Sequence, residues 1–170
     1  LKNNTDYSSV HGLYFSHKKI NVQNKNYINY NSLYNKKAKS NDGPDQFERI
    51  KKYLNSDVSY YPVYAISKLE YLKIIIRNTN KYSLNIHFDE FMFSIFSLIL
   101  GKMKVFNSFY CSKEQNNFMW LNEKKVQEFY NNESKDLFLN GIKSNINIKN
   151  FNNEKEIFLN KIFDYKKKIA

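Results

Sequence analysis

The chain has 170 residues and a formal net charge of +11 at pH 7, from 27 Lys and Arg against 16 Asp and Glu. That length suits one domain of ordinary size, and 42% hydrophobic with 17% aromatic residues excludes a wholly disordered chain. Only 4 Gly and 2 Pro argue against a β-sandwich, a β-barrel or a Gly-rich nucleotide-binding enzyme. A single cysteine, Cys111, excludes an internal disulfide framework and a zinc site built from cysteines.

The positive charge is carried almost entirely by lysine, since Arg49 and Arg77 are the only arginines. Lys, Asn, Tyr, Ile and Phe have AT-rich codons, so genome composition explains part of the lysine excess. A basic surface favours an acidic partner such as RNA or an anionic lipid. Proteins selected for base and phosphate contacts usually contain more arginine, whose planar fork binds bidentately. The charge therefore indicates an acidic partner without identifying it.

Residues 1–44 are predicted to form an extended basic N-terminal tail of coil. They carry seven Lys against two Asp, and they lack a sustained apolar period. Such a tail can stack aromatic rings on bases and neutralise phosphates, or it can wrap a protein neighbour. The candidate partner-binding residues of the tail are Tyr7, Tyr14, Phe15, Lys18, Lys19, Tyr27, Tyr30, Tyr34, Lys36 and Lys37.

Helical patterns follow, so we expect an all-α domain over residues 45–170. Helices are expected near residues 45–55, 67–76, 89–100, 122–130, 136–142 (stopped by Gly141) and 153–169. The third of these is apolar on nearly all sides, so it should be the centre of the fold. Its run of ten residues, 91–100, is far shorter than the roughly 20 residues that span a bilayer, so no stand-alone membrane span is expected.

Aromatic side chains are more numerous than a small core needs to fill its volume. Most of them are expected in the core, and some are candidates for a groove that binds a partner helix. These candidate core or groove residues are Phe91, Phe93, Phe96, Phe106, Phe109 and Trp120.

The segment Thr79–Glu90 resembles an EF-hand loop that leads into its exit helix. Ile86 stands where that family places an aliphatic residue in a short β-bridge, and Glu90 stands at the twelfth loop position. A second unit fits at residues 114–125, where an entering helix would bury Phe106, Phe109 and Tyr110. A third fits at residues 59–70. Their order is similar to that in the regulatory EF-hand regions of mitochondrial calcium-uptake regulators and of calcium-regulated aspartate/glutamate carriers.

The resemblance implies a degenerate EF-hand-like domain that binds no Ca²⁺. Ca²⁺ takes oxygen ligands at alternate loop positions and needs glycine at the sixth. Lys81 and Leu84 replace a ligand and the glycine in the first loop, and Lys125 replaces the bidentate carboxylate in the second. No metal or cofactor is therefore expected. A generic helical bundle fits the same apolar spacing, and Tyr71–Arg77 is faintly similar to the helix of the mitochondrial LYR family, without its signature tripeptide.

Residues that could perform catalysis are scattered along the chain. His11, His17 and His87 lie apart, and nothing local brings them together with Cys111. We therefore expect no enzyme, but a structural or accessory subunit of a large assembly that acts as a calcium-independent protein-interaction module. The alternative is a mitochondrial ribosomal protein that contacts rRNA through its Lys/Tyr-rich tail. The EF-hand resemblance and the missing initial Met favour the mitochondrion, with the cytoplasm or cytoskeleton as the alternative.

Overall fold

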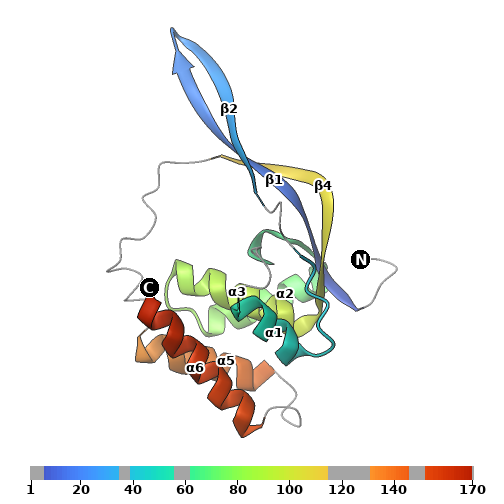
Figure 1. The fold of residues 1–170 in the computed structure, drawn as a ribbon, viewed down its shortest axis with the longest axis vertical. Helices are drawn as coiled ribbons and strands as arrows, with labels where there is room; N and C mark the ends of the chain where they lie inside the picture. The colour runs from blue at the N-terminus through green and yellow to red at the C-terminus, as the bar shows by residue number, and fades with distance from the viewer. Residues whose placement is uncertain (1–5, 35–38, 56–61, 115–130, 146–151, 170) are drawn as a thin grey trace.

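A four-stranded sheet and five α-helices make up the described part of this α+β fold (Figure 1). The computed structural model describes residues 6–34, 39–55, 62–114, 131–145 and 152–169. The strands are β1 (Tyr7–Val22), β2 (Lys25–Tyr34), β3 (Ile66–Ser67) and β4 (Lys102–Glu114). The helices are α1 (Gln46–Leu54), α2 (Leu69–Lys81), α3 (Ile86–Leu100), α5 (Asn132–Asn145) and α6 (Asn153–Ile169), with a 3-10 turn at Pro62–Tyr64. The expectation of an all-α domain is therefore wrong.

Strand β1 is the centre of the sheet. Strand β4 runs parallel to it from Tyr7 to His17, and β2 runs antiparallel to it from Tyr14 to Val22. The two residues of β3 pair with the start of β1. The prediction of a coil over residues 1–44 is wrong for residues 7–34, because this stretch, rich in tyrosine and branched residues, satisfies its backbone donors and acceptors in a ladder.

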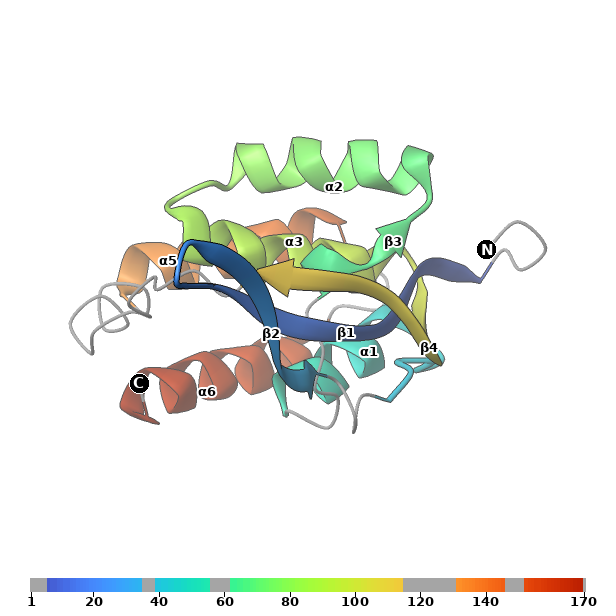
Figure 2. The same ribbon diagram turned by 90° about the horizontal axis from the view of Figure 1, so that it is seen from above.

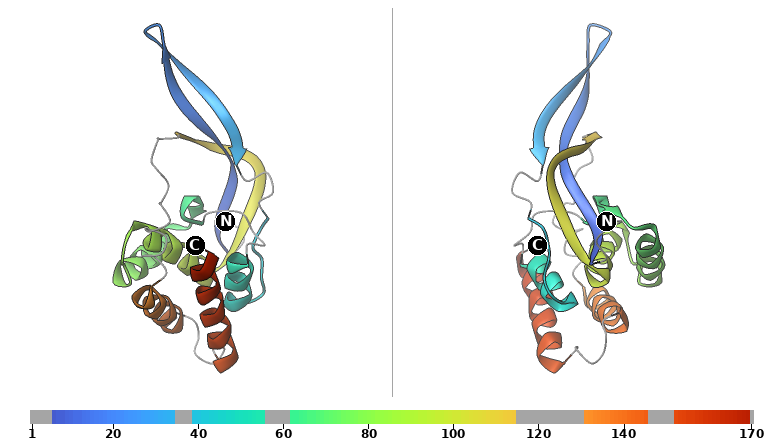
Figure 3. Two further views of the ribbon diagram at one scale, coloured as in Figure 1. Left: turned by 60° about the vertical axis from the view of Figure 1, so that its left-hand side comes forward. Right: turned by 90° about the vertical axis from the view of Figure 1, so that its right-hand side faces the viewer.

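The β1–β2 hairpin closes through a two-residue turn and extends away from the helices (Figure 3). Gln23 and Asn24 have φ values of 49° and 62°, and two successive positive φ angles give a turn whose twist matches that of the strands. Strand β4 ends opposite His17. Residues 18–29, which we call the arm, therefore form a two-stranded ribbon within the described part of the chain.

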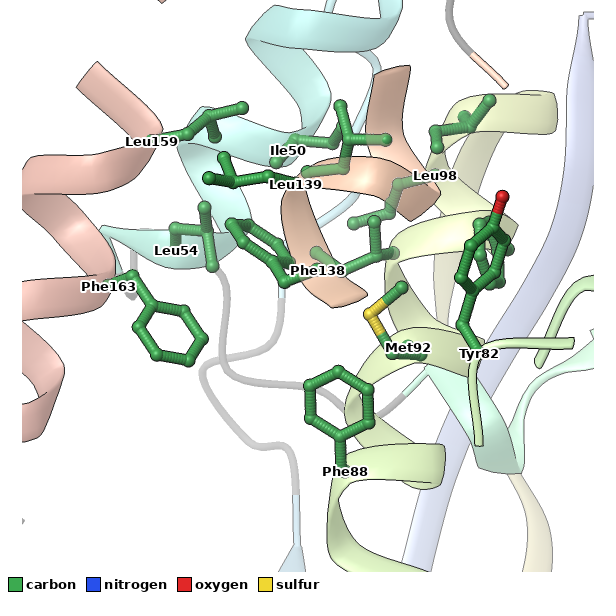
Figure 4. Close-up of a cluster of buried hydrophobic side chains, with 14 of the residues drawn as sticks. Ile50, Leu54, Tyr82, Phe88, Met92, Leu98, Phe138, Leu139, Leu159 and Phe163 are labelled. Carbon is green, nitrogen blue, oxygen red and sulfur yellow. The ribbon is translucent and has the colours of Figure 1, made fainter. Parts of the chain in front are cut away.

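Helix α3 is the centre of the helical layer, as its sequence predicted. Helix α2 lies on one side of it, and α1 and α6 lie on the other (Figure 2). Met92, Ile95 and Phe96 of α3 are each at most 1% exposed. Figure 4 shows this cluster, in which α3 meets side chains from α1, α5 and α6, and Phe138 packs 5.6 Å from the ring of Phe163. The cluster also contains Ile75 of α2, so the hydrophobic effect holds all five described helices together.

The connection from α3 to β4 is a single residue, Gly101, and it fixes the start of β1. A Cβ at Gly101 would lie 2.9 Å from the Cβ of Ser8. The Ser8 hydroxyl lies 3.2 Å from the carbonyl oxygen of Ser97 and 3.1 Å from that of Lys102. This close approach seats the sheet on the end of α3.

The EF-hand interpretation of residues 79–90 is wrong. Helix α2 continues to Lys81 and α3 begins at Ile86, so both the first loop position and the expected β-bridge residue lie in helices. Asp89 tightens the short connection, since its carboxylate accepts from the hydroxyl of Ser83 at 2.8 Å and from the amide of Leu84 at 3.1 Å. A four-residue link of this kind leaves no room for a cation-binding loop.

The other two EF-hand units are also wrong where the structure describes them, while residues 59–61 and 115–125 lie outside the described residues. The entering helix expected before residue 114 is strand β4, and the unit at 59–70 contains β3 and the start of α2.

Helix α5 does not stop at Gly141, as expected, but continues to Asn145. The missing side chain of Gly141 makes room for Met92, since an added Cβ would lie 2.7 Å from the Cε of Met92. The helix expected at 122–130 lies outside the described residues. Among the described helices, none has the length and apolar character needed to span a membrane.

Candidate functional site

The arm is the most exposed regular element of the described structure. Residues 18–30 are all exposed, because β4 and the helices end short of them (Figure 1). Large apolar side chains share this exposure. They are Ile20 (38% exposed), Val22 (50%), Tyr27 (51%), Ile28 (55%) and Tyr30 (61%). Large apolar side chains exposed together on one element favour a binding site.

The register of the hairpin sorts the side chains of the arm and its base onto two faces, because directly opposed residues in an antiparallel pair lie on the same face. The Tyr27 face consists of Lys18, Ile20, Val22, Lys25, Tyr27 and Asn29. The Tyr30 face consists of His17, Lys19, Asn21, Asn26, Ile28 and Tyr30. Both faces mix apolar and basic groups.

An aromatic row crosses the three strands at the base of the arm, on the same side as the Tyr30 face. The ring of Phe15 in β1 lies 5.1 Å from Phe109 in β4 and 6.0 Å from Tyr30 in β2. Phe109 is 58% exposed and Tyr30 is 61% exposed, while Phe15 between them is half-buried. Two of the three rings of this row therefore offer most of their surface to a ligand.

The charged side chains around this surface are lysines, apart from the carboxylate of Glu114. Residues 7–34 contain no Asp or Glu, while the arm carries Lys18, Lys19 and Lys25. Glu114, the last residue of β4, bonds to the ammonium of Lys19 at 3.0 Å. The Lys19 side chain is 65% exposed and that of Glu114 is 39% exposed, so this surface ion pair contributes little to stability.

One edge of the sheet also lacks a strand partner in the described structure. The backbone of Asn41 pairs with Met103 near the start of β4, through bonds of 2.8 and 2.9 Å, and the hydroxyl of Ser40 accepts from the Val105 amide at 3.0 Å. From Phe106 to Glu114, β4 pairs only with β1 among the described residues. The aromatic row therefore lies beside an open strand edge.

The structure brings together half of the predicted tail residues. Phe15, Lys18, Lys19, Tyr27 and Tyr30 lie on the arm or at its base. Tyr7 lies at the far end of β1 from the arm, and Tyr14 pairs with Tyr34 across the hairpin. Lys36 and Lys37 lie outside the described residues.

The predicted core or groove residues divide into two groups. Phe96 is buried, and Phe91 and Phe93 pack against the same core. Phe106 and Phe109 stand instead on β4, where they are 51% and 58% exposed. Trp120 lies outside the described residues. Sequence reasoning placed Phe109 in a helix and so missed its position in the aromatic row.

The titratable side chains reveal no reactive arrangement in the described part of the chain. His11 is 1% exposed, its Nδ1 lies 2.7 Å from the carbonyl oxygen of Gly12, and burial lowers its pKa. His17 lies on the Tyr30 face, 6.2 Å from the Tyr30 ring, and Cys111 is half-buried in β4. The described residues contain no group of three or more His, Cys, Asp or Glu that could hold a metal ion.

Comparison with known proteins adds no family to this description. No family model matches the sequence, and searches of curated proteins and of solved structures found no match.

Proposed function

We propose that this protein is a non-enzymatic accessory subunit of a larger macromolecular assembly, and that it binds the assembly through the arm. The observation that carries the proposal is the exposure of Ile20, Tyr27 and Ile28 on a ribbon that extends beyond the body of the protein. Covering these side chains removes apolar surface from water and stabilises a complex. The proposal assigns no reaction to the chain.

The anchoring of the arm supports the same proposal. An isolated two-stranded hairpin is marginally stable in water, but the first half of β1 is held between β4 and the body. The body therefore supplies the stability, and the arm supplies an extended surface that other molecules can reach from both sides. Binding elements are commonly projected from a rigid scaffold in this way.

Shortening the arm tests the proposal without removing the strand that the body needs. His17 pairs with Tyr30, so a two-residue Asn-Gly turn can replace residues 18–29 and close the hairpin at that pair. The shortened chain should show the helical circular dichroism and the thermal midpoint of the full chain. An exposed substitution on α6, Lys161→Gln, provides a control that leaves the arm intact.

The readout is velocity sedimentation of tagged chains in extracts of the source cells. The full chain and Lys161→Gln should sediment rapidly, as parts of a large particle. The shortened chain should remain in the slow fractions expected for a free protein, since the full chain itself is only 20.4 kDa. If the shortened chain still sediments with the large particle, the arm is not the docking element and the proposal is wrong.

A further inference from the structure

We infer that the Tyr30 face and the aromatic row bind single-stranded RNA, with bases stacking on Tyr30 and Phe109 and a phosphate meeting Lys19. This inference rests on the proposed function, because it identifies the partner that the arm meets in the assembly. It follows from three observations: the spacing of the rings, the sign of the charge, and the ion pair between Lys19 and Glu114.

The rings of the aromatic row suit a single strand of bases. Tyr30, Phe15 and Phe109 come from three adjacent strands and stand on one face, with centroids 6.0 and 5.1 Å apart. Aromatic side chains on neighbouring strands of an open sheet can each stack on one base of a single strand. Tyr30 and Phe109, the outer members, are the exposed ones, so the row offers two stacking positions separated by Phe15.

The charge of the arm selects among the classes of partner. The arm carries three lysines, Lys19 on the Tyr30 face and Lys18 and Lys25 on the Tyr27 face, and no carboxylate occurs between residues 7 and 34. A polyanion is therefore the complementary partner, whereas a second copy of this chain, with its own net charge of +11, would be repelled. A duplex keeps its bases inside the stack, so it could use the lysines but not the rings. A polyglutamate segment, which carries no ring or large apolar group, would likewise use the lysines alone.

Glu114 is the one carboxylate that meets the Tyr30 face among the described residues. Its bond to Lys19 occupies the ammonium that a phosphate would contact, and its negative charge repels that phosphate. Replacing Glu114 by glutamine should free Lys19 and tighten RNA binding. A purely apolar protein partner would gain nothing from the same substitution.

Fluorescence anisotropy of a labelled single-stranded uridine 12-mer, titrated with the full chain, tests the inference. We expect saturable binding that weakens as salt rises, since displaced counterions accompany each phosphate contact. Tyr30→Leu should weaken binding by about tenfold, the usual effect of losing one stacked base. Tyr27→Leu, a matched change on the opposite face of the same strand, should alter the affinity by less than about twofold. Glu114→Gln should increase the affinity.

Two further probes exclude the competing partners. A duplex RNA of the same length and a polyglutamate peptide of equal charge should bind more weakly than the single strand and should be insensitive to Tyr30→Leu. If either binds as tightly, or if Tyr30→Leu and Tyr27→Leu weaken RNA binding equally, the surface does not read single-stranded RNA and the inference is wrong. Lys19→Gln should reduce the gain from Glu114→Gln to the part that comes from lost repulsion, so a gain of undiminished size without Lys19 also contradicts it.

The outcome separates this inference from the proposed function. Suppose that the full chain binds no RNA and that the shortened chain no longer sediments with the large particle. The arm would then dock on protein, so the RNA inference would be wrong and the proposed function would stand. Unchanged sedimentation of the shortened chain would reject the docking role itself.

Discussion

At the scale of single residues, the buried guanidinium of Arg49 joins two helices and a turn. Arg49 is 6% exposed and donates from Nε to the carbonyl of Leu98 at 2.7 Å and from Nη2 to that of Ile99 at 3.2 Å. Its Nη1 donates to the carbonyl of Gly43 at 3.1 Å. The carbonyl groups in the last turn of a helix lack intrahelical partners and carry the negative end of the dipole. Arg49 satisfies two of them in α3.

Replacing Arg49 by lysine should therefore destabilise the protein although the charge is kept. A single ammonium cannot reproduce the planar set of donors that reaches three carbonyl groups, and the loss should lower the free energy of unfolding by about 3 kcal/mol. Urea unfolding monitored by circular dichroism measures this loss in the free energy of unfolding. The exposed Arg77→Lys on α2 should change stability by less than about 0.5 kcal/mol. Equal unfolding midpoints for the two variants would contradict this role of Arg49.

His11 makes the stability of the fold depend on pH. Its ring is 1% exposed, and burial lowers its pKa from 6.5 more than the backbone bond to Gly12 raises it. The unfolded chain therefore binds the proton first, so the free energy of unfolding decreases as pH falls below about 6.5 and levels off below the lowered pKa of the folded state. Urea midpoints measured at intervals from about pH 7.5 down to about pH 5 should show the decrease.

The control for His11 is a change that removes the titrating ring. His11→Gln should lower stability near neutral pH but flatten the decrease toward acid, whereas His17→Gln, on the hairpin, should keep it. A decrease of equal size in the His11→Gln protein would assign the pH dependence to other groups.

At the scale of elements, α3 determines whether the body folds. Phe96 is 1% exposed and packs 6.0 Å from the ring of Tyr82, so Phe96→Ala should cost about 3–5 kcal/mol. Ser94 is also buried, but its hydroxyl bonds the carbonyl of Glu90 one turn earlier in the same helix. Ser94→Ala should therefore cost less than about 1 kcal/mol, because that carbonyl belongs to the helix ladder. Thermal unfolding of both variants provides the comparison, and two equal midpoints would show that α3 is not the core.

The helices were predictable because their signals are local. Asp45 precedes α1 and its carboxylate caps the amide of Glu48 at 2.9 Å, as its position before an apolar period indicates. Helix α6 runs over Asn153–Ile169, the range that its pattern predicted. The all-apolar run of α3 indicated a central helix, and the buried cluster around it confirms that prediction.

The strands were not predicted because the local patterns in their sequences are those of coil or helix. The hairpin turn is Gln23-Asn24, without the glycine that usually marks such turns. The arm exposes both faces, so it lacks the alternation of apolar and polar residues that reveals a half-buried strand. In β4, Phe106, Phe109 and Tyr110 follow helical spacing, but pairing with β1, far away in sequence, makes the segment a strand.

The candidate site was predictable in composition and not in geometry. The mixture of lysines with Phe15, Tyr27 and Tyr30 is by itself typical of a binding segment. The contact of Phe15 with Phe109 depends on a parallel pairing between two strands that lie far apart in the sequence. Local patterns carry no information about that pairing, so the aromatic row emerges only from the fold.

At the scale of the whole molecule, β1 is shared between the body and the arm. Its first half lies against β4 and the end of α3, and its second half continues into the arm (Figure 1). The proposed division into a tail of residues 1–44 and a domain of residues 45–170 stays a prediction. The contacts of Ser8 with Ser97 and Lys102 indicate that the domain needs more of the chain than residue 45 onward.

Removing residues 1–44 should therefore disturb the body, whereas shortening the arm should not. Without β1, strand β4 loses its ladder partner and exposes a long unpaired edge, which favours aggregation. Size-exclusion chromatography should show aggregates of residues 45–170, and thermal unfolding should show a lowered midpoint. A monomeric, fully stable fragment of residues 45–170 would show that the sheet is dispensable for the body.

The proposed function depends on a hairpin that is anchored at its base and exposed at its end. Hydrogen–deuterium exchange of the full chain, read by mass spectrometry, tests this division directly. Peptides from residues 86–100 and 7–17 should exchange slowly, because core elements open only with the whole fold, while those from residues 18–29 should exchange orders of magnitude faster. Equal, strong protection of residues 18–29 would mean that the arm packs on the body, and fast exchange of residues 7–17 would mean that the sheet is not formed; either result would contradict an anchored, projecting arm.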